Sequence, residues 1–233
     1  MNIKDYRDKE LKYYVIALSL LVLIVNYKSI LIASIDGNDL NVIKMVEEFV
    51  LALFEGIGLS SIIGTLVFLA DSLYTSHQKD ALTLMFLTKK PAEKIFENIR
   101  DDKFNDDRVA PEFAREYYSE IINGIPSGKD KYKYQNYKWY NIYQKYQGEM
   151  KVLVAQRDYL LCRDMCIATI TEIIGVLICS ITRVIPWSFK SLVLLLVMYV
   201  ITMIATYYKA ERFCKNVVVV DLSNAENNMG NNK

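Results

Sequence analysis

Four apolar segments, each close to the length that crosses a lipid bilayer, stand in two pairs around a charged middle. The first pair covers residues 13–35 and 49–70, and the second covers residues 165–182 and 191–208. A bilayer core about 30 Å thick needs roughly 20 helical residues to span it. Lipid also requires each spanning segment to satisfy its own backbone hydrogen bonds. The sequence therefore predicts an all-α membrane protein with four transmembrane helices.

The spans divide the chain into four expected parts. Residues 1–70 form an N-terminal tail with the first transmembrane pair, and residues 71–164 form a helical stalk domain. Residues 165–208 form the second pair, and residues 209–233 form a partly disordered tail. The middle is nearly neutral and the whole chain carries a net charge of +1. Because polyanion binding needs a strong positive bias, nucleic acid is not an expected partner.

Positive charge predicts the orientation. The N-terminal tail carries Lys4, Arg7, Lys9 and Lys12, whereas the two short loops and their borders carry few basic residues, among them Lys28 near the end of the first span. Lysine and arginine near membrane spans favour the cytoplasmic side. We therefore expect both termini and the stalk domain in the cytoplasm, and a multi-pass location in the inner membrane.

Proline, glycine and apolar spacing predict helices through the stalk domain. The second span is expected to run on as a helix over residues 68–87 until Pro91 starts a new helix over residues 92–100. Pro111 opens a further helix that ends near Asn123. Residues 101–107 form a polar break, and residues 123–128 form a turn rich in Asn, Gly and Pro.

A single long helix is predicted for residues 132–164. Its apolar residues recur at a seven-residue repeat, which favours one buried face; they are Trp139, Tyr143, Tyr146, Met150 and Leu153.

Tyrosine and lysine alternate along the first half of this helix. One interpretation is an amphipathic core helix whose hydroxyls reach water, and another is a helix on anionic lipid headgroups. A third is a recognition surface for a partner or a nucleotide, because aromatic rings can stack on bases while lysines hold phosphates. The candidate recognition residues are Tyr137, Trp139, Tyr140, Tyr143, Arg157 and Arg163.

Two carboxylates lie within predicted spans, Glu55 in the second and Glu172 in the third. An acidic side chain in lipid is costly and usually faces a bundle interior or water. Each glutamate could simply fix helix packing, or it could line an oligomeric pore or ion path together with Ser61 and Thr65. We expect the two carboxylates to lie about 10 Å apart along the membrane normal, from a rise of 1.5 Å per residue.

Small residues accompany both glutamates. Gly56, Ser60 and Gly64 repeat every four residues on the second span, while Ala168 and Gly175 share a face with Glu172 on the third. Small residues at this spacing let membrane helices approach closely. They are the candidates for helix packing and for assembly into a homo-oligomer.

The dipeptide Arg-Asp occurs at residues 157–158 and again at residues 163–164, just before the third span. Such pairs can hold helix ends by ordinary ion pairing. Alternatively, they can form a buried network that couples movement of the stalk to the span.

The sequence does not indicate an enzyme, a metal site or a cofactor. His77 is the single histidine and has no nucleophile at a recognisable spacing, and the four cysteines complete no metal-ligand pattern. Residues 217–220 are four consecutive valines, expected to form a short strand or a docking segment. The asparagine-rich end after them is expected to be disordered.

The order of two spans, a helical insert and two further spans resembles the four-transmembrane effector proteins of bacterial cyclic-oligonucleotide anti-phage defence systems. The stretch WYNIYQKYQGEMKVLVAQRDYLLCRD, residues 139–164, is similar to the charged aromatic segment before the later spans of such proteins. The resemblance implies a protein that assembles in the inner membrane and permeabilises it when triggered. Since no separate sensor domain is visible, a partner would have to supply the trigger.

Three functions therefore compete. The first is an oligomeric pore-forming or membrane-perturbing effector gated through its stalk domain. The second is a non-conducting anchor or sensor that recruits a soluble cytosolic partner protein. The third is a small transporter or lipid-modifying enzyme, although transporters usually carry inverted repeats and broken helices at mid-membrane. The sequence favours the first, with the lipid bilayer and further copies of the chain as partners.

Overall fold

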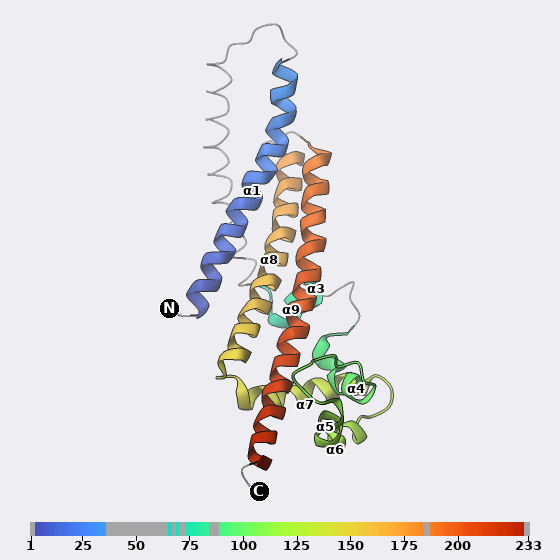
Figure 1. Cartoon of the computed structure of the whole chain (residues 1–233). Coiled ribbons are helices and arrows are strands. Elements are labelled where there is room, and N and C mark those ends of the chain that lie inside the picture. The colour runs from blue at the N-terminus through green and yellow to red at the C-terminus, as the bar shows by residue number, and fades with distance from the viewer. Residues whose placement is uncertain are drawn as a thin grey trace. The chain divides into compact units, whose positions relative to one another are not determined.

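The computed structural model describes residues 3–35, 65–66, 69, 73–83, 89–183 and 187–230, with side chains of the first helix described for residues 7–25. These residues form helices joined by turns, and no strand occurs among them (Figure 1). The all-α class is therefore confirmed for the described part of the chain.

The chain divides into two compact units. The bundle unit comprises residues 1–83 and 161–204, and the head unit comprises residues 84–160 and 205–233. Two long helices, α8 (Met150–Ile181) and α9 (Phe189–Gly230), each contribute residues to both units. Residues 209–233, expected to stand apart as a tail, group with the head unit.

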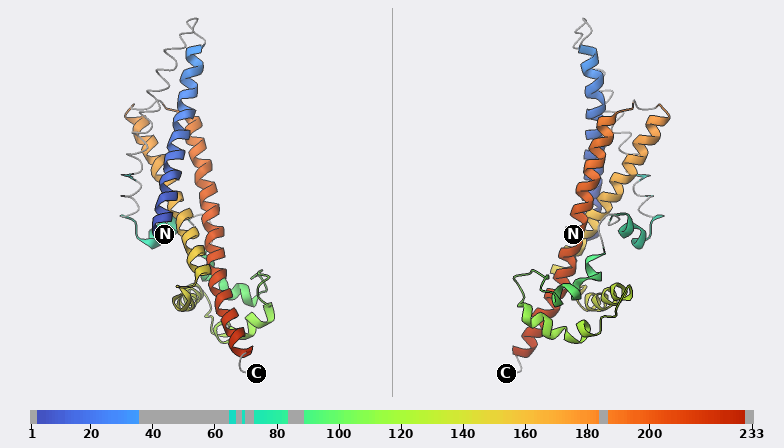
Figure 2. Two further views of the ribbon diagram at one scale, coloured as in Figure 1. Left: turned by 60° about the vertical axis from the view of Figure 1, so that its left-hand side comes forward. Right: turned by 90° about the vertical axis from the view of Figure 1, so that its right-hand side faces the viewer.

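The bundle unit is built from α1 (Ile3–Ile35), α3 (Ser76–Thr83) and the apolar parts of α8 and α9. Within it, α1, α8 and α9 run alongside one another (Figure 2). Their apolar contacts are made by Leu18 and Val22 of α1, Val176 of α8 and Leu195 of α9. The spans predicted for residues 165–182 and 191–208 thus lie within helices, apart from the turn residue Thr182.

The continuous helix expected over residues 68–87 is wrong, because the chain turns at Tyr74 and Thr75 before α3 begins. The Thr75 N–H donates to Gln78 Oε1 at 2.9 Å, and the Gln78 N–H donates to Thr75 Oγ1 at 3.4 Å. This reciprocal pair is a capping box, which starts a new helix by satisfying its first N–H groups. The pattern Thr-x-x-Gln was present in the sequence and overlooked.

The head unit contains the short elements η1 (Pro91–Glu93), α4 (Ile95–Arg100), α5 (Pro111–Tyr117) and α6 (Ser119–Asn123), followed by α7 (Asp130–Tyr146). Pro91 and Pro111 open helical elements as predicted. The expected helix from Pro111 to Asn123 is interrupted at Tyr118. The turn predicted after Asn123 is confirmed, and Gly128 adopts the left-handed φ of 79° that favours glycine.

The single helix predicted over residues 132–164 is also wrong. The chain turns at residues 147–149, around Gly148, and α8 starts anew at Met150. Trp139 is consequently buried while Met150 is 68% exposed, so the seven-residue repeat does not form one face. Glycine weakens a helix interior by about 1 kcal/mol, which makes this position the natural place for the break.

The four valines at residues 217–220 form no strand, because α9 continues through them to Gly230. All four are buried in the head-unit core, together with Leu222. The disorder expected after them also fails for residues 223–230, which are helical. Burial of the apolar side chains has overridden the strand preference of valine.

Asp221 links this part of α9 to the rest of the head unit through side-chain hydrogen bonds. It is 4% exposed and accepts a hydrogen bond of 2.6 Å from the Tyr118 hydroxyl. A second bond joins it to Tyr146. Burial, reinforced by the Asp221 charge, raises the pKa of Tyr118 above its ordinary value and that of Tyr146 to about 12. Both hydroxyls therefore remain protonated at neutral pH.

Candidate functional site

The bundle unit buries several polar side chains and exposes many apolar ones. Buried hydroxyls come from all three long helices: Ser19, Thr169, Ser191 and Thr202. Large apolar side chains of α8 and α9 are exposed: Ile174, Ile178, Val193, Leu196, Val197, Val200, Ile201 and Ile204. Water-soluble proteins rarely expose a contiguous apolar surface of this kind.

Two helices, α8 and α9, are long and apolar enough to cross a membrane, judged by length and composition over the described residues. Membrane association is therefore supported for this part of the chain. The second predicted span lies almost entirely outside the described residues.

Glu172 is a charged side chain buried inside this bundle, within the third predicted span. It lies on α8, is 1% exposed and shares a hydrogen bond with Ser19 of α1. Its Oε1 atom is buried and has no hydrogen-bond partner among the described residues. A buried carboxyl oxygen without a partner loses its hydration and gains nothing in return. The structure thus places Glu172 in the bundle interior, as predicted for this position.

Hydroxyl groups continue from Glu172 towards the start of the apolar segment. The Tyr14 hydroxyl and Thr169 Oγ1 are 2.7 Å apart, and Thr169 donates to the Met165 carbonyl at 2.9 Å. Since the Thr169 proton is used in that bond, Tyr14 is the donor to Thr169. Tyr14 also lies within electrostatic range of Glu172. The Tyr14 and Thr169 hydroxyls therefore form a second polar contact between α1 and α8, beside the contact between Ser19 and Glu172.

A buried ion-pair cluster, defined by Arg7, Asp80, Arg163 and Asp164, joins three helices of the bundle unit. Arg163 NH1 lies 3.2 Å from Asp80 Oδ1, and Arg163 Nε lies 3.5 Å from Asp164 Oδ1. Arg7 Nε of α1 lies 3.7 Å from Asp164 Oδ2. The side chains of Arg163 and Asp164 are only 8% and 4% exposed. This matches the buried network that the second Arg-Asp pair suggested, rather than a surface ion pair.

The first Arg-Asp pair has a different environment, in the head unit. Asp158 Oδ1 accepts from Arg157 at 2.7 Å, and Asp158 Oδ2 accepts from Lys209 of α9 at 2.9 Å. Partial burial acts to raise the pKa of Asp158, but hydrogen bonds from Lys209 and Arg157 outweigh burial and lower the pKa below its ordinary value. The pair therefore ties α8 to α9 within this unit.

Asp158 is expected to contribute stability that acid removes. Because its folded pKa is depressed, its contribution is present above the ordinary value of 3.8 and is lost as the pH falls through the folded pKa. We expect Asp158→Asn to lower the stability of the head unit near neutral pH by under about 1 kcal/mol and to reduce its acid sensitivity. Trp139 fluorescence in a Trp187→Phe background, followed from pH 7 to pH 2, measures both. An unchanged acid transition in Asp158→Asn would contradict the assignment.

The predicted recognition residues of α7 separate into two groups. Trp139 and Tyr143 are stacked at 5.7 Å and both pack against Phe213 of α9, while Trp139 Nε1 donates to the Cys214 carbonyl at 3.3 Å. Trp139 is therefore a buried core residue, which corrects its assignment to a recognition surface, and Tyr143 is partly buried against the same core. Tyr137 and Tyr140 are 61% and 48% exposed and remain available for a partner.

The small residues of α8 also differ from one another. Ala168 is 1% exposed and packs against Val15 of α1, as expected for a helix-packing position. At Gly175 an added Cβ would meet nothing within 4 Å, so no close helix approach uses it within the described chain. Its role in contacts between copies stays a prediction. Glu55, Gly56, Ser60, Ser61 and Gly64 lie outside the described residues, whereas Thr65 is described and exposed.

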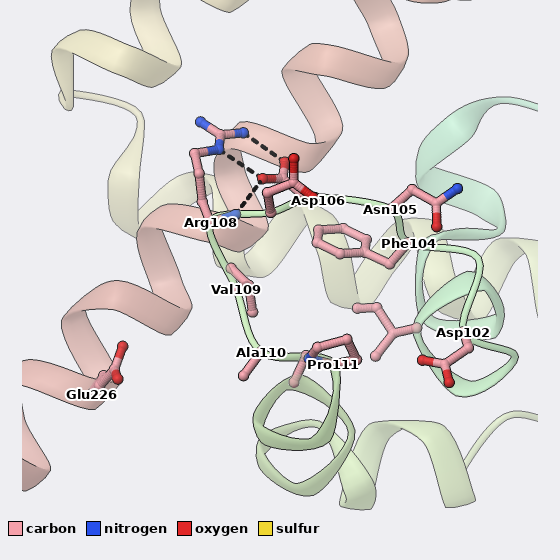
Figure 3. Close-up of a pocket in the computed structure, with 12 residues that line it drawn as sticks. Asp102, Phe104, Asn105, Asp106, Arg108, Val109, Ala110, Pro111 and Glu226 are labelled. Carbon is pink, nitrogen blue, oxygen red and sulfur yellow. Dashed lines mark hydrogen bonds and ion pairs between the residues drawn. The ribbon is translucent and has the colours of Figure 1, made fainter.

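A groove that sequence reasoning did not anticipate lies in the head unit, between the loop after α4, the start of α5 and the end of α9 (Figure 3). Its volume is about 600 Å³ and its walls include Asp102, Asp106, Asp107 and Glu226. Two of these carboxylates already have cationic partners, since Asp102 lies 2.8 Å from Arg115 and Asp106 lies 2.7 Å from Arg108. Within the described residues, no group of acidic, histidine or cysteine side chains could hold a metal ion.

No protein-family model, curated protein or solved structure matches this chain. The resemblance to four-transmembrane defence effectors therefore stays a prediction from the sequence.

Proposed function

We propose that this chain is an oligomeric, multi-pass protein of the bacterial inner membrane that permeabilises or perturbs the membrane in anti-phage defence. In this proposal all four apolar segments span the bilayer and both termini face the cytoplasm. The observation that carries it is the placement of Glu172, which is buried in the bundle with one oxygen that has no hydrogen-bond partner among the described residues, while large apolar side chains of α8 and α9 are exposed. Ionisable residues inside membrane segments mark functional sites such as substrate or ion pathways and proton relays.

Helix continuity supports gating through the head unit. α8 and α9 each have residues in both units, and Lys209 of α9 pairs with Asp158 of α8 within the head unit. A partner that binds the head unit would act on α8, which also carries Glu172, and on α9, which also contributes to the bundle unit. The buried ion-pair cluster would hold the resting arrangement until then.

Membrane potential in living cells tests the proposal. We expect cells expressing the wild-type chain to depolarise when phage infection triggers it, and cells expressing Glu172→Gln at equal membrane abundance to lose most of this response. Glu55→Gln, in the second predicted span, is expected to act in the same direction. The matched control is Glu120→Gln, which changes an exposed carboxylate of α6. Depolarisation that is equal in Glu172→Gln and in wild type would contradict the proposal.

The second candidate is a non-conducting anchor that recruits a soluble partner, and exposed Tyr137 and Tyr140 favour it. In that case no depolarisation occurs, and Tyr137→Ala/Tyr140→Ala abolishes protection against phage while Glu172→Gln leaves it intact. A nucleotide and anionic lipid headgroups are further candidate ligands of the same surface.

A further inference from the structure

The predicted spans contain three charged residues, Lys28, Glu55 and Glu172. Among the span residues whose side chains the structure describes, Glu172 is the only charged one, since residues 13–25 and 191–208 contain none. The single basic residue within the four spans is Lys28, near the end of the first. Long basic side chains near a helix end extend towards the interface. Glu172 is therefore the charged group that the described bundle buries within a predicted span.

The groups around Glu172 are oxygen donors of the kind that bind small cations. Ser19 Oγ is hydrogen-bonded to Glu172, and the Tyr14 hydroxyl and Thr169 Oγ1 lie one turn away along the bundle. Carboxylate and hydroxyl oxygens suit hard cations, and acidic side chains that line a pore favour cations over anions. Among the described residues no lysine or arginine forms an ion pair with Glu172 that would cancel its charge.

The described arrangement closes this site. Glu172 is 1% exposed, so the bundle shields its side chain from water and ions. An arrangement that brings Glu172 to water would hydrate its unpartnered Oε1 and lower the cost of burial. Opening would hydrate Glu172 and would disrupt the apolar contacts between the helices of the bundle.

We infer that the conducting state of this protein is selective for cations over anions, with Glu172 as the selecting group. This inference rests on the proposed function. Glu172 of each chain would contribute to a ring of negative charges in an oligomer, flanked by hydroxyl oxygens. Such a ring attracts K⁺ and Na⁺ and repels Cl⁻.

The test uses the full-length chain in planar bilayers with a KCl gradient, where the reversal potential reports which ion carries the current. For the wild-type chain we expect reversal close to the K⁺ equilibrium potential and at least a fivefold preference for K⁺ over Cl⁻. Glu172→Gln should move the reversal potential towards zero, and Glu172→Asp should keep the preference. Glu120→Gln is the control for a carboxylate outside the bundle.

The outcomes separate the two proposals. If the inserted wild-type chain passes no current in any condition, the proposed function fails and the inference fails with it. Current that is unselective, or that favours Cl⁻ and thereby points to Lys28, supports permeabilisation and overturns the inference. Cation preference that survives unchanged in Glu172→Gln also overturns it, because another group would then set the selectivity.

Discussion

Ending the chain after Lys215 is expected to unfold the head unit completely. The deletion removes Val217, Val218, Val219, Val220 and Leu222, all of them buried in the head-unit core. At about 1.5–3 kcal/mol for each buried side chain, the loss is roughly 10 kcal/mol. A domain of this kind has a total stability of about 5–15 kcal/mol. The deletion also removes Asp221, the acceptor for the Tyr118 hydroxyl.

Trp139 fluorescence under urea, in a Trp187→Phe background, measures this effect because Trp139 packs against Phe213 in the same core. The matched control ends the chain after Ala225 and removes only the end of α9, where residues 226–229 are exposed. That shorter deletion should change stability by under about 0.5 kcal/mol. A cooperative unfolding transition that persists in the chain ending at Lys215 would show that the tail is dispensable.

Breaking the Arg163–Asp80 pair is expected to destabilise the bundle unit strongly. The two side chains are 8% and 16% exposed and come from α8 and α3. Removing one member of a buried pair leaves the other charge uncompensated, which costs about 3–5 kcal/mol. Replacing both members with apolar residues removes both charges. We therefore expect Arg163→Leu and Asp80→Leu each to cost about 3 kcal/mol and the double variant to cost much less than their sum.

Unfolding of the purified chain in mixed micelles measures the four members of this double-mutant cycle. The control cycle uses the exposed pair Arg115 and Asp102 of the head unit, with side-chain exposures of 35% and 59%. Exposed pairs of this kind contribute about 0–1 kcal/mol. Additive losses at Arg163 and Asp80 would show that the two charges do not depend on each other.

Much of the backbone was predictable because its causes are local. Pro91 and Pro111 open helical elements, and Gly128 takes the left-handed conformation in the predicted turn, since these residues restrict or free their own dihedral angles. The apolar runs of α8 and α9 are helical as expected. Two predicted helices were too long because local stop signals were not recognised. These signals are the Thr75–Gln78 capping box and Gly148.

The candidate site was predictable only in part. An acidic residue within a run of apolar residues identified Glu172 from composition alone, because few positions in a membrane segment tolerate a charge. Nothing in the local pattern identified its neighbour Ser19, or the partners Asp80 and Arg7 of the second Arg-Asp pair. These contacts join helices far apart in the chain, and their choice depends on which faces meet.

By itself, the sequence determined the helical class, the apolar segments of α8 and α9, and the presence of a carboxylate within one of them, because these follow from residue-by-residue hydrophobicity and backbone preference. Only the tertiary structure decided that Trp139 is a core residue and Tyr143 is partly buried against the same core, while Tyr137 and Tyr140 face outward. Only the tertiary structure showed that Val217–Val220 form part of α9 and are buried in the head-unit core, although valine-rich runs favour strands. The physical reason is that burial is a property of the assembled faces, and its free energy exceeds the small local preferences that a sequence window records.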